Sequence, residues 1–148
     1  MTSGKFEITI DAPASRVWPW VADLGKHAEF SPTPYSVDWT GGEPNAVGSR
    51  YRSVGVIPGD KHHVNEGEIL EYDSPRRFVL RAHDKQGSYL NTFELTPQGE
   101  ATTVTHRLDF EEMHGPSALM VPVLFPLWGK GQIRARMALL KKVVESSA

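Results

Sequence analysis

His106 is the side chain in this sequence best suited to acid–base chemistry. It lies in a stretch of alternating polarity, on the same face as Leu108 and Phe110. Successive side chains of a strand point to opposite faces, so we expect His106 to lie inward among apolar neighbours. Such a ring could be a general base or bind a ligand carbonyl. The simpler interpretation is a core histidine that bonds Tyr89 or Asn91 on the adjacent strand.

Other polar groups are predicted to face the same interior. Tyr89 and Asn91 share one face of a strand, where they could orient a phenol or ketone, or be polar residues kept hydrated in a wide cavity. His62 and His63 are adjacent in a strand and therefore point to opposite faces, so one metal ion cannot readily use both. We expect neither a metal nor a cofactor.

The side-chain orientation in the strand at 62–72 is the hardest to predict. Glu66 and Glu68 share one parity and should face solvent, because an unpaired buried carboxylate is costly. That choice turns His63 and Asn65 inward, and a bulge at Gly67 could change the register midway.

The predicted ligand-facing residues combine polar groups with aromatic bulk. Tyr51 faces inward if Arg50 and Arg52 face outward, and Trp39 lies inward on the preceding strand. The complete candidate set is Trp39, Tyr51, His63, Asn65, Tyr89, Asn91, His106, Phe110, Leu124 and Trp128, with His106 as the weak catalytic candidate.

Composition excludes several other kinds of chemistry. The 148 residues contain no cysteine, so disulfides, thiolate metal sites and a cysteine nucleophile are excluded. A net charge of −2 gives no indication of a nucleic-acid partner.

No segment approaches the roughly 20 apolar residues of a membrane span. The N-terminus lacks the apolar core of a signal peptide. We expect one cytoplasmic domain over 1–148, monomeric or homodimeric, without stable membrane insertion.

The periodicity of apolar residues predicts the elements that position these side chains. Alternation predicts strands, and turn residues separate them by short connectors, which favours antiparallel neighbours. The period of 3.6 returns at the C-terminus and predicts a helix over about 131–145. The predicted strands are Lys5–Ile10, Tyr35–Thr40, Ser49–Ile57, His62–Tyr72, Arg77–His83, Tyr89–Thr96 and Thr102–Phe110.

A short helix should follow the first strand. Pro13 suits its first turn, Pro19 predicts a kink, and Gly25 is expected to end it. The apolar stripe places Trp20 against the sheet and leaves Trp18 at the surface or an edge. One further helical turn could follow in the stretch "KHAEFSPTP".

The stretch "MVPVLFPLW" at 120–128 has nine residues without a polar side chain, which should not face water. It could be a lid over a cavity mouth, a dimer contact or a membrane-touching patch. Pro122 and Pro126 argue against both a regular helix and a central strand. We favour a mobile lid over residues 116–128.

This order of elements favours an α+β fold in which a curved seven-stranded antiparallel sheet wraps around the long C-terminal helix. One or two short helices follow the first strand. The sequence resembles the polyketide cyclase/dehydrase branch of the START-like (SRPBCC, helix-grip) superfamily. The resemblance is carried, in order, by "IDAPASRVWPWVAD", "VDWTGGEPNAVGSRYR", "EYDSPRRFVL", "GEATTVTHRLDF" and the C-terminal helix.

The resemblance implies a cavity between sheet and helix that binds a small hydrophobic molecule, aromatic or polyketide-like. It leaves three functions open, because the family includes carriers, sensors and cyclases. The first is a ligand-binding protein. The second is a true cyclase or dehydratase that uses His106, with Tyr89 or His63 as the next candidates. The third is an interaction module that acts through its outer surface and has a filled interior.

Overall fold

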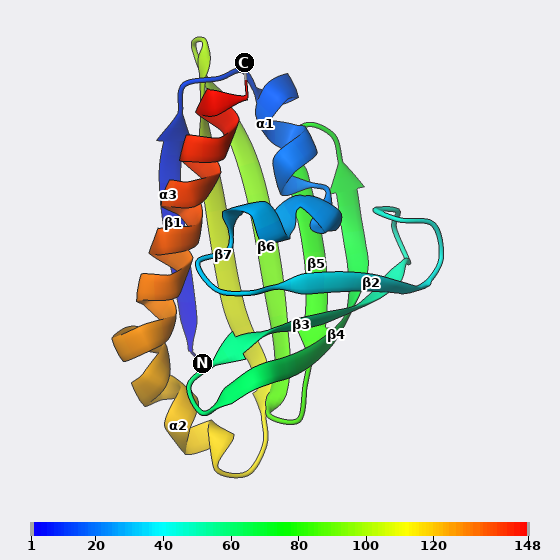
Figure 1. Cartoon of the computed structure of the whole chain (residues 1–148), viewed down its shortest axis with the longest axis vertical. Helices are drawn as coiled ribbons and strands as arrows, with labels where there is room; N and C mark the ends of the chain where they lie inside the picture. Colours follow the sequence, from blue (N-terminus) through cyan, green and yellow to red (C-terminus); the bar gives the residue numbers. More distant parts are fainter. Residues whose placement is uncertain (1, 148) are drawn as a thin grey trace.

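A single curved sheet wraps around a long C-terminal helix in the computed structural model, which describes residues 2–147 (Figure 1). Its seven strands are all antiparallel and lie in the order β1-β7-β6-β5-β4-β3-β2. This arrangement confirms the predicted fold class. The strands are β1 (Ser3–Ile10), β2 (Ser36–Gly41), β3 (Arg50–Ile57), β4 (Asp60–Asp73), β5 (Arg77–His83), β6 (Gly87–Gln98) and β7 (Ala101–Met113).

The predicted side-chain orientations are confirmed in the central strands. Tyr51 and Ser53 are each 3% exposed, whereas Arg50 and Arg52 face solvent. In β4 the expected bulge is displaced from Gly67. The register shifts between Ile69 and Glu71 instead, after the inward-facing part of the strand has ended. The inward parity of β4 therefore holds through the region that faces the helix.

The early helices are α1 (Ala14–Val21) and the 3-10 helix η1 (Leu24–Phe30). The expected end at Gly25 is wrong, because α1 stops at Val21 and Gly25 lies inside η1. The placement of Trp18 at the surface is also wrong, since only 6% of Trp18 is exposed. Leu24 lies beyond the end of α1. The buried face of α1 therefore consists of Val17, Trp18 and Val21, and Trp20 is only partly buried.

The prolines of the 120–128 stretch do not prevent helix formation. The helix α2 (Ser117–Leu124) contains Pro122, and a π-helical turn, η2 (Phe125–Gly129), contains Pro126 and leads into α3 (Lys130–Ser146). The helix α3 confirms the helix predicted over about 131–145, and together with α2 and η2 it forms a helical segment of 30 residues. The π-helical turn widens the backbone locally at Pro126, whereas Pro122 removes one backbone donor within α2.

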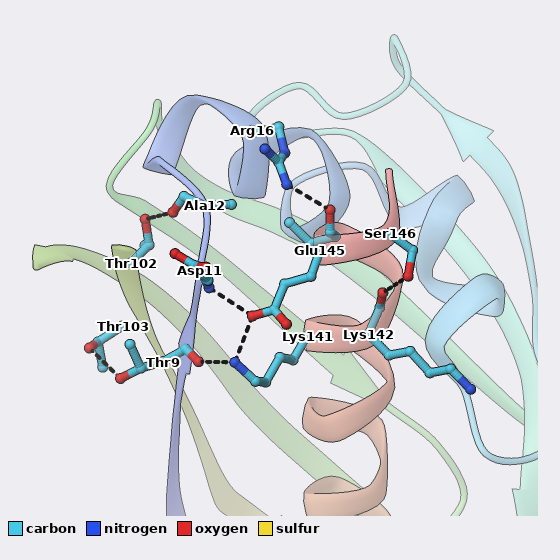
Figure 2. A network of polar contacts seen from close by, with 11 residues as sticks. Thr9, Asp11, Ala12, Arg16, Thr102, Thr103, Lys141, Lys142, Glu145 and Ser146 are labelled. Atoms are coloured by element: carbon cyan, nitrogen blue, oxygen red, sulfur yellow. Dashed lines mark hydrogen bonds and ion pairs between the residues drawn. The ribbon is translucent and has the colours of Figure 1, made fainter. Parts of the chain in front are cut away.

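The C-terminal end of α3 is fastened to β1 and α1 by polar contacts (Figure 2). Lys141 Nζ donates to the carbonyl of Thr9 at 2.9 Å, and the backbone N–H of Asp11 donates to Glu145 Oε2 at 2.8 Å. Arg16 donates to the carbonyl of Val144 at 3.1 Å, close to the last turn of the helix. Met137, Leu140 and Val144 are buried in the same region. This end of α3 is therefore the close-packed end.

Gly67 lets a large ring lie flat against the sheet. It pairs with Tyr51 on the neighbouring strand β3, and a Cβ atom at Gly67 would overlap the Tyr51 ring. Tyr51 is 3% exposed and belongs to the core cluster. A glycine is thus required at position 67, because the Tyr51 ring occupies the space that a Cβ atom would need.

We expect Gly67→Ala to destabilise the fold by about 1–3 kcal/mol, because the added methyl group must displace the Tyr51 ring. Urea unfolding measures the loss. The control is Gly55→Ala on β3, where the added Cβ would lie 3.4 Å from Tyr35 Cδ2, an ordinary contact. Equal stability changes in the two variants would contradict this account of Gly67.

Candidate ligand-binding cavity

A partly open cavity of about 320 Å³ lies between the concave face of the sheet and the C-terminal helical segment. Strands β3 to β7 supply one wall, η1 and the segment after it supply a second, and η2 with the first half of α3 supplies the third. The lining is mainly apolar and aromatic. Its residues include Leu24, His27, Tyr35, Tyr51, Ser53, Asn65, Leu80, Ala82, Tyr89, Asn91, Phe93, His106, Leu108, Phe110, Phe125, Trp128, Gln132, Ile133 and Arg136.

Most of the candidate residues meet in this cavity. They come from four strands and from η2, elements that are far apart in the sequence. Strand parity places the sheet residues on one concave face, and the π-helical turn places the tryptophan opposite them. The candidates that line the cavity are Tyr51, Asn65, Tyr89, Asn91, His106, Phe110 and Trp128.

Three candidates lie outside the cavity lining. Trp39 packs edge-on against Tyr51, with ring centroids 6.1 Å apart. Leu124 is 37% exposed and lines a neighbouring groove of about 150 Å³. His63 has the expected inward parity, but its ring is bound to Asp84 just after the end of β5.

The carboxylate of Asp84 joins two strands beside the cavity. His63 Nε2 lies 2.5 Å from Asp84 Oδ2, and the Tyr89 hydroxyl donates to the same oxygen. Backbone N–H groups of Gln86 and Gly87 donate to Oδ1 at 2.7 and 3.1 Å. The hydrogen bond to Asp84 raises the pKa of His63, against the opposing effect of burial. The hydrogen bond from Tyr89 to Asp84 therefore holds the Tyr89 ring in the cavity wall and uses its hydroxyl proton.

Asp84 itself is held as a carboxylate by its neighbours. Burial, the largest influence, raises its pKa, but the hydrogen bonds from His63, Tyr89 and Gln86 together lower it below the ordinary value. The His63–Asp84 pair is therefore favoured as an ion pair. His63 is a structural partner of Asp84 in this arrangement and does not belong to the cavity lining.

His106 lines the cavity from β7 and is 4% exposed. Its ring stacks on Phe93 with centroids 4.2 Å apart, and its Nε2 lies 3.0 Å from Asn91 Oδ1. An amide oxygen only accepts, so Nε2 donates and carries the proton. Within residues 2–147, Nδ1 of this ring is covered by protein and has no hydrogen-bond partner. The geometry matches the simpler interpretation, a core histidine bonded to Asn91.

The electrostatic environment keeps His106 neutral. Burial, with smaller contributions from the charges of Arg136 and His27, lowers its pKa to about 3. His27 responds in the same way: burial and Arg136 lower its pKa to about 4, and its Nε2 donates to the carbonyl of Val21 at 2.8 Å. Two uncharged imidazoles and one guanidinium therefore share this part of the cavity.

Sequence reasoning missed Arg136 and His27, although both carry a signal. Arg136 lies three residues after Ile133 and four before Leu140, a spacing that places all three on one face of a helix. His27 lies midway between Leu24 and Phe30, and all three are buried in η1 because a 3-10 helix repeats every three residues. In both cases a polar residue stands at a position where the helical repeat predicts a buried apolar one, and this pattern could have indicated an inward side chain.

The outer face of α2 and η2 is apolar and exposed. Leu119 and Leu127 are 78% and 79% exposed, and Met120 and Val123 lie between them in the sequence. The inner face carries Phe125, which is 6% exposed and lines the cavity. Only the η2 part of the segment lines the cavity, through Phe125, Trp128 and Gly129, so the mobile lid over residues 116–128 stays a prediction.

Over residues 2–147, no group of three or more His, Cys, Asp or Glu side chains is placed to hold a metal ion. No helix in that range is long and apolar enough to cross a membrane.

An antiparallel sheet that grips a C-terminal helix, with a cavity between them, defines a helix-grip protein of the START-like (SRPBCC) type. The chain belongs to the family described as "Polyketide cyclase / dehydrase and lipid transport", whose family model matches residues 1–145. The resemblance found in the sequence is thereby confirmed. No curated protein matches the sequence significantly.

Solved structures from several bacteria share the fold. The protein TTHA0849 from Thermus thermophilus is 21% identical, with a TM-score of 0.78 and 99% of each chain covered. MLL2253 from Mesorhizobium loti is 16% identical, with a TM-score of 0.75 and 99% of each chain covered. A conserved protein from Geobacillus kaustophilus is 17% identical, with a TM-score of 0.75, and the match covers 99% of this chain and 97% of that one. At these identities the likeness shows the fold alone.

We expect His106→Phe to weaken the acid sensitivity of the fold. In the wild type the unfolded His106 binds a proton below about pH 6.5, whereas the folded ring does so only near pH 3. The free energy of unfolding therefore decreases as the pH is lowered from about 6.5 to about 3. Removing the ring should reduce that slope by about 1.4 kcal/mol per pH unit. Urea unfolding at several pH values below 6.5 measures the slope.

The matched control is His62→Phe, which makes the same substitution at an exposed position on β4. It should keep the wild-type slope, because this side chain does not enter the cavity. A His106→Phe variant with an unchanged slope would show that the folded ring takes up its proton as readily as the unfolded one.

Proposed function

We propose that residues 1–148 act as one domain that binds a small hydrophobic molecule, aromatic or polyketide-like, between the sheet and α3. The observation that carries the proposal is the cavity itself. A helix-grip fold can fill this space with side chains, yet here about 320 Å³ stays open. Ligand pockets usually have volumes of about 300–1,000 Å³, so the cavity suits a compact ligand of one or two rings.

The chemistry of the walls supports a flat apolar ligand. Phe93, Phe110 and Trp128 line the cavity with aromatic side chains, and Ile133 adds an aliphatic side chain on α3. Aromatic rings favour offset or edge-on neighbours, which gives a planar ligand several favourable positions. Membership of a family described by polyketide chemistry and lipid transport agrees with this ligand class.

Binding is better supported than turnover. A general acid or base must reach the proton that it transfers, to within roughly 3 Å. His106 directs its only proton at Asn91, and its other ring nitrogen is covered by protein. Tyr89 donates its proton to Asp84, and His63 is bound to the same carboxylate. The candidates for proton transfer are therefore engaged with protein groups.

The alternative of an interaction module is less well supported. That function predicts a filled interior, whereas the cavity here is open. The exposed apolar side chains of α2 are its best support, and they are equally compatible with a lid or a dimer contact.

The proposal is tested by filling the cavity. Ala82 is 6% exposed and lines it from β5, so Ala82→Phe should reduce the affinity for a neutral aromatic probe, naphthalenemethanol, by about tenfold or more, because the new ring occupies the space of the ligand. Isothermal titration calorimetry measures the affinity. The control Ala138→Phe adds the same ring on the exposed face of α3 and should bind the probe normally. Undiminished binding by Ala82→Phe would contradict the proposed site.

A further inference from the structure

Arg136 presents a positive charge to the cavity without a countercharge from the protein. It lies on α3, one turn after Gln132, and both side chains line the cavity. Its guanidinium lies 5.2 Å from the centre of the Tyr35 ring and 6.0 Å from that of Phe30. None of the ion pairs found in residues 2–147 involves Arg136.

Three arginines outside the cavity show the opposite pattern. Arg76, Arg77 and Arg81 reach solvent, and each pairs with a carboxylate at 2.7 or 2.8 Å. Exposed ion pairs contribute little, because water already solvates both charges. Arg136 lies in the wall of an apolar cavity and needs a partner more than these exposed arginines do, yet it has no carboxylate partner in the described part of the protein.

Burial makes this arrangement costly. Desolvation lowers the pKa of Arg136, while the neighbouring Tyr35 acts in the opposite direction. An arginine nevertheless stays protonated in proteins, so the cavity wall carries a permanent positive charge. The two aromatic rings offset part of the lost hydration through cation–π contacts. They cannot accept the hydrogen bonds of its five N–H groups.

No other side chain of the described cavity lining carries a charge at pH 7. His27 and His106 are neutral at pH 7, because burial lowers their pKa values to about 4 and about 3. Among the lining residues in the described part of the chain, there is no Asp, Glu or Lys. The cavity therefore combines apolar walls with a single cationic group at one side.

We propose that the ligand is a hydrophobic acid whose carboxylate binds Arg136 while its apolar body lies against Phe93, Phe110 and Trp128. This inference rests on the proposed function and adds the charge of the ligand. The planar guanidinium fork matches a carboxylate through two parallel hydrogen bonds. One arginine balances one carboxylate, whereas a phosphate monoester would bring a second charge that nothing in the lining neutralises.

The test compares two ligands that share a ring system and differ in charge. Naphthalenecarboxylate and naphthalenemethanol are each titrated into the protein at pH 7 by calorimetry. The wild type should bind the carboxylate about tenfold or more tightly than the alcohol, because charge-assisted hydrogen bonds are the stronger kind. Arg136→Met should abolish this preference while it leaves the affinity for the alcohol within about threefold.

Two further variants separate charge from shape. Arg136→Lys keeps the charge without the planar fork, and should keep part of the preference. Arg134→Met is the matched control, because Arg134 is exposed on the same helix and does not line the cavity, so this variant should behave as the wild type. If Arg136→Met fails to fold, Arg136→Gln replaces it, and the comparison of the two ligands on the wild type needs no variant.

The outcomes distinguish this inference from the proposed function. If the wild type binds neither compound, the proposed function itself fails. If it binds both equally, or if a folded Arg136→Met or Arg136→Gln variant still prefers the carboxylate, the cavity binds apolar molecules and the role of Arg136 is refuted. In that case the guanidinium only packs on Tyr35 and Phe30.

Discussion

The closure of the sheet on α3 is the contact on which the rest of the structure depends. At its C-terminal end the helix buries Met137, Leu140 and Val144, and Lys141 and Glu145 fasten it to the end of β1. Toward its N-terminal end the helical segment faces the sheet with large aromatic side chains, Phe125 and Trp128, that line the cavity. One helix can fill only part of the concave face of a seven-stranded sheet, and the unfilled part is the cavity.

The polar groups of the cavity follow from this geometry. Side chains in the interior of an apolar cavity must find partners in the protein or leave their hydrogen bonds to a ligand. Asn91 and Asp84 provide partners for His106, His63 and Tyr89. Arg136 has no carboxylate partner in the described residues. The strands therefore carry a neutral His106 bonded to Asn91, with the His63–Asp84 ion pair beside the cavity, and the helix carries a cation without a carboxylate partner.

Much of the fold was predictable from the sequence because strand parity is a strong local pattern. The β5 strand matches its predicted bounds, and the inward orientation of Tyr51 and Asn65 followed from the need to keep arginine and glutamate side chains in water. His106 faces inward because it alternates in the strand with the same parity as its apolar neighbours Leu108 and Phe110. The direction of a side chain is set by its own strand, so for these residues local reasoning was enough.

The remaining features depend on contacts that a local pattern does not contain. His63 points inward as predicted, but Asp84, a residue 21 positions later, determines what it contacts. Trp18 is buried because α1 ends at Val21, and that end could not be inferred from the apolar stripe alone. The helical path includes Pro122 within α2 and passes Pro126 in a π-helical turn, a local widening of the backbone that the apolar pattern does not predict. Arg136 was overlooked because an arginine within an apolar stripe was not treated as inward.

The central claim is that the space between the sheet and α3 is a ligand site, and filtered nuclear Overhauser spectroscopy tests it most directly. The experiment uses isotopically labelled protein with unlabelled naphthalenecarboxylate. We expect cross-peaks from the ligand ring protons to Phe93, Phe110 and Ile133, which line the cavity from three different elements. Cross-peaks confined to Leu119 and Leu127, on the exposed face of the α2 and η2 segment, would place the ligand on the surface and contradict the account.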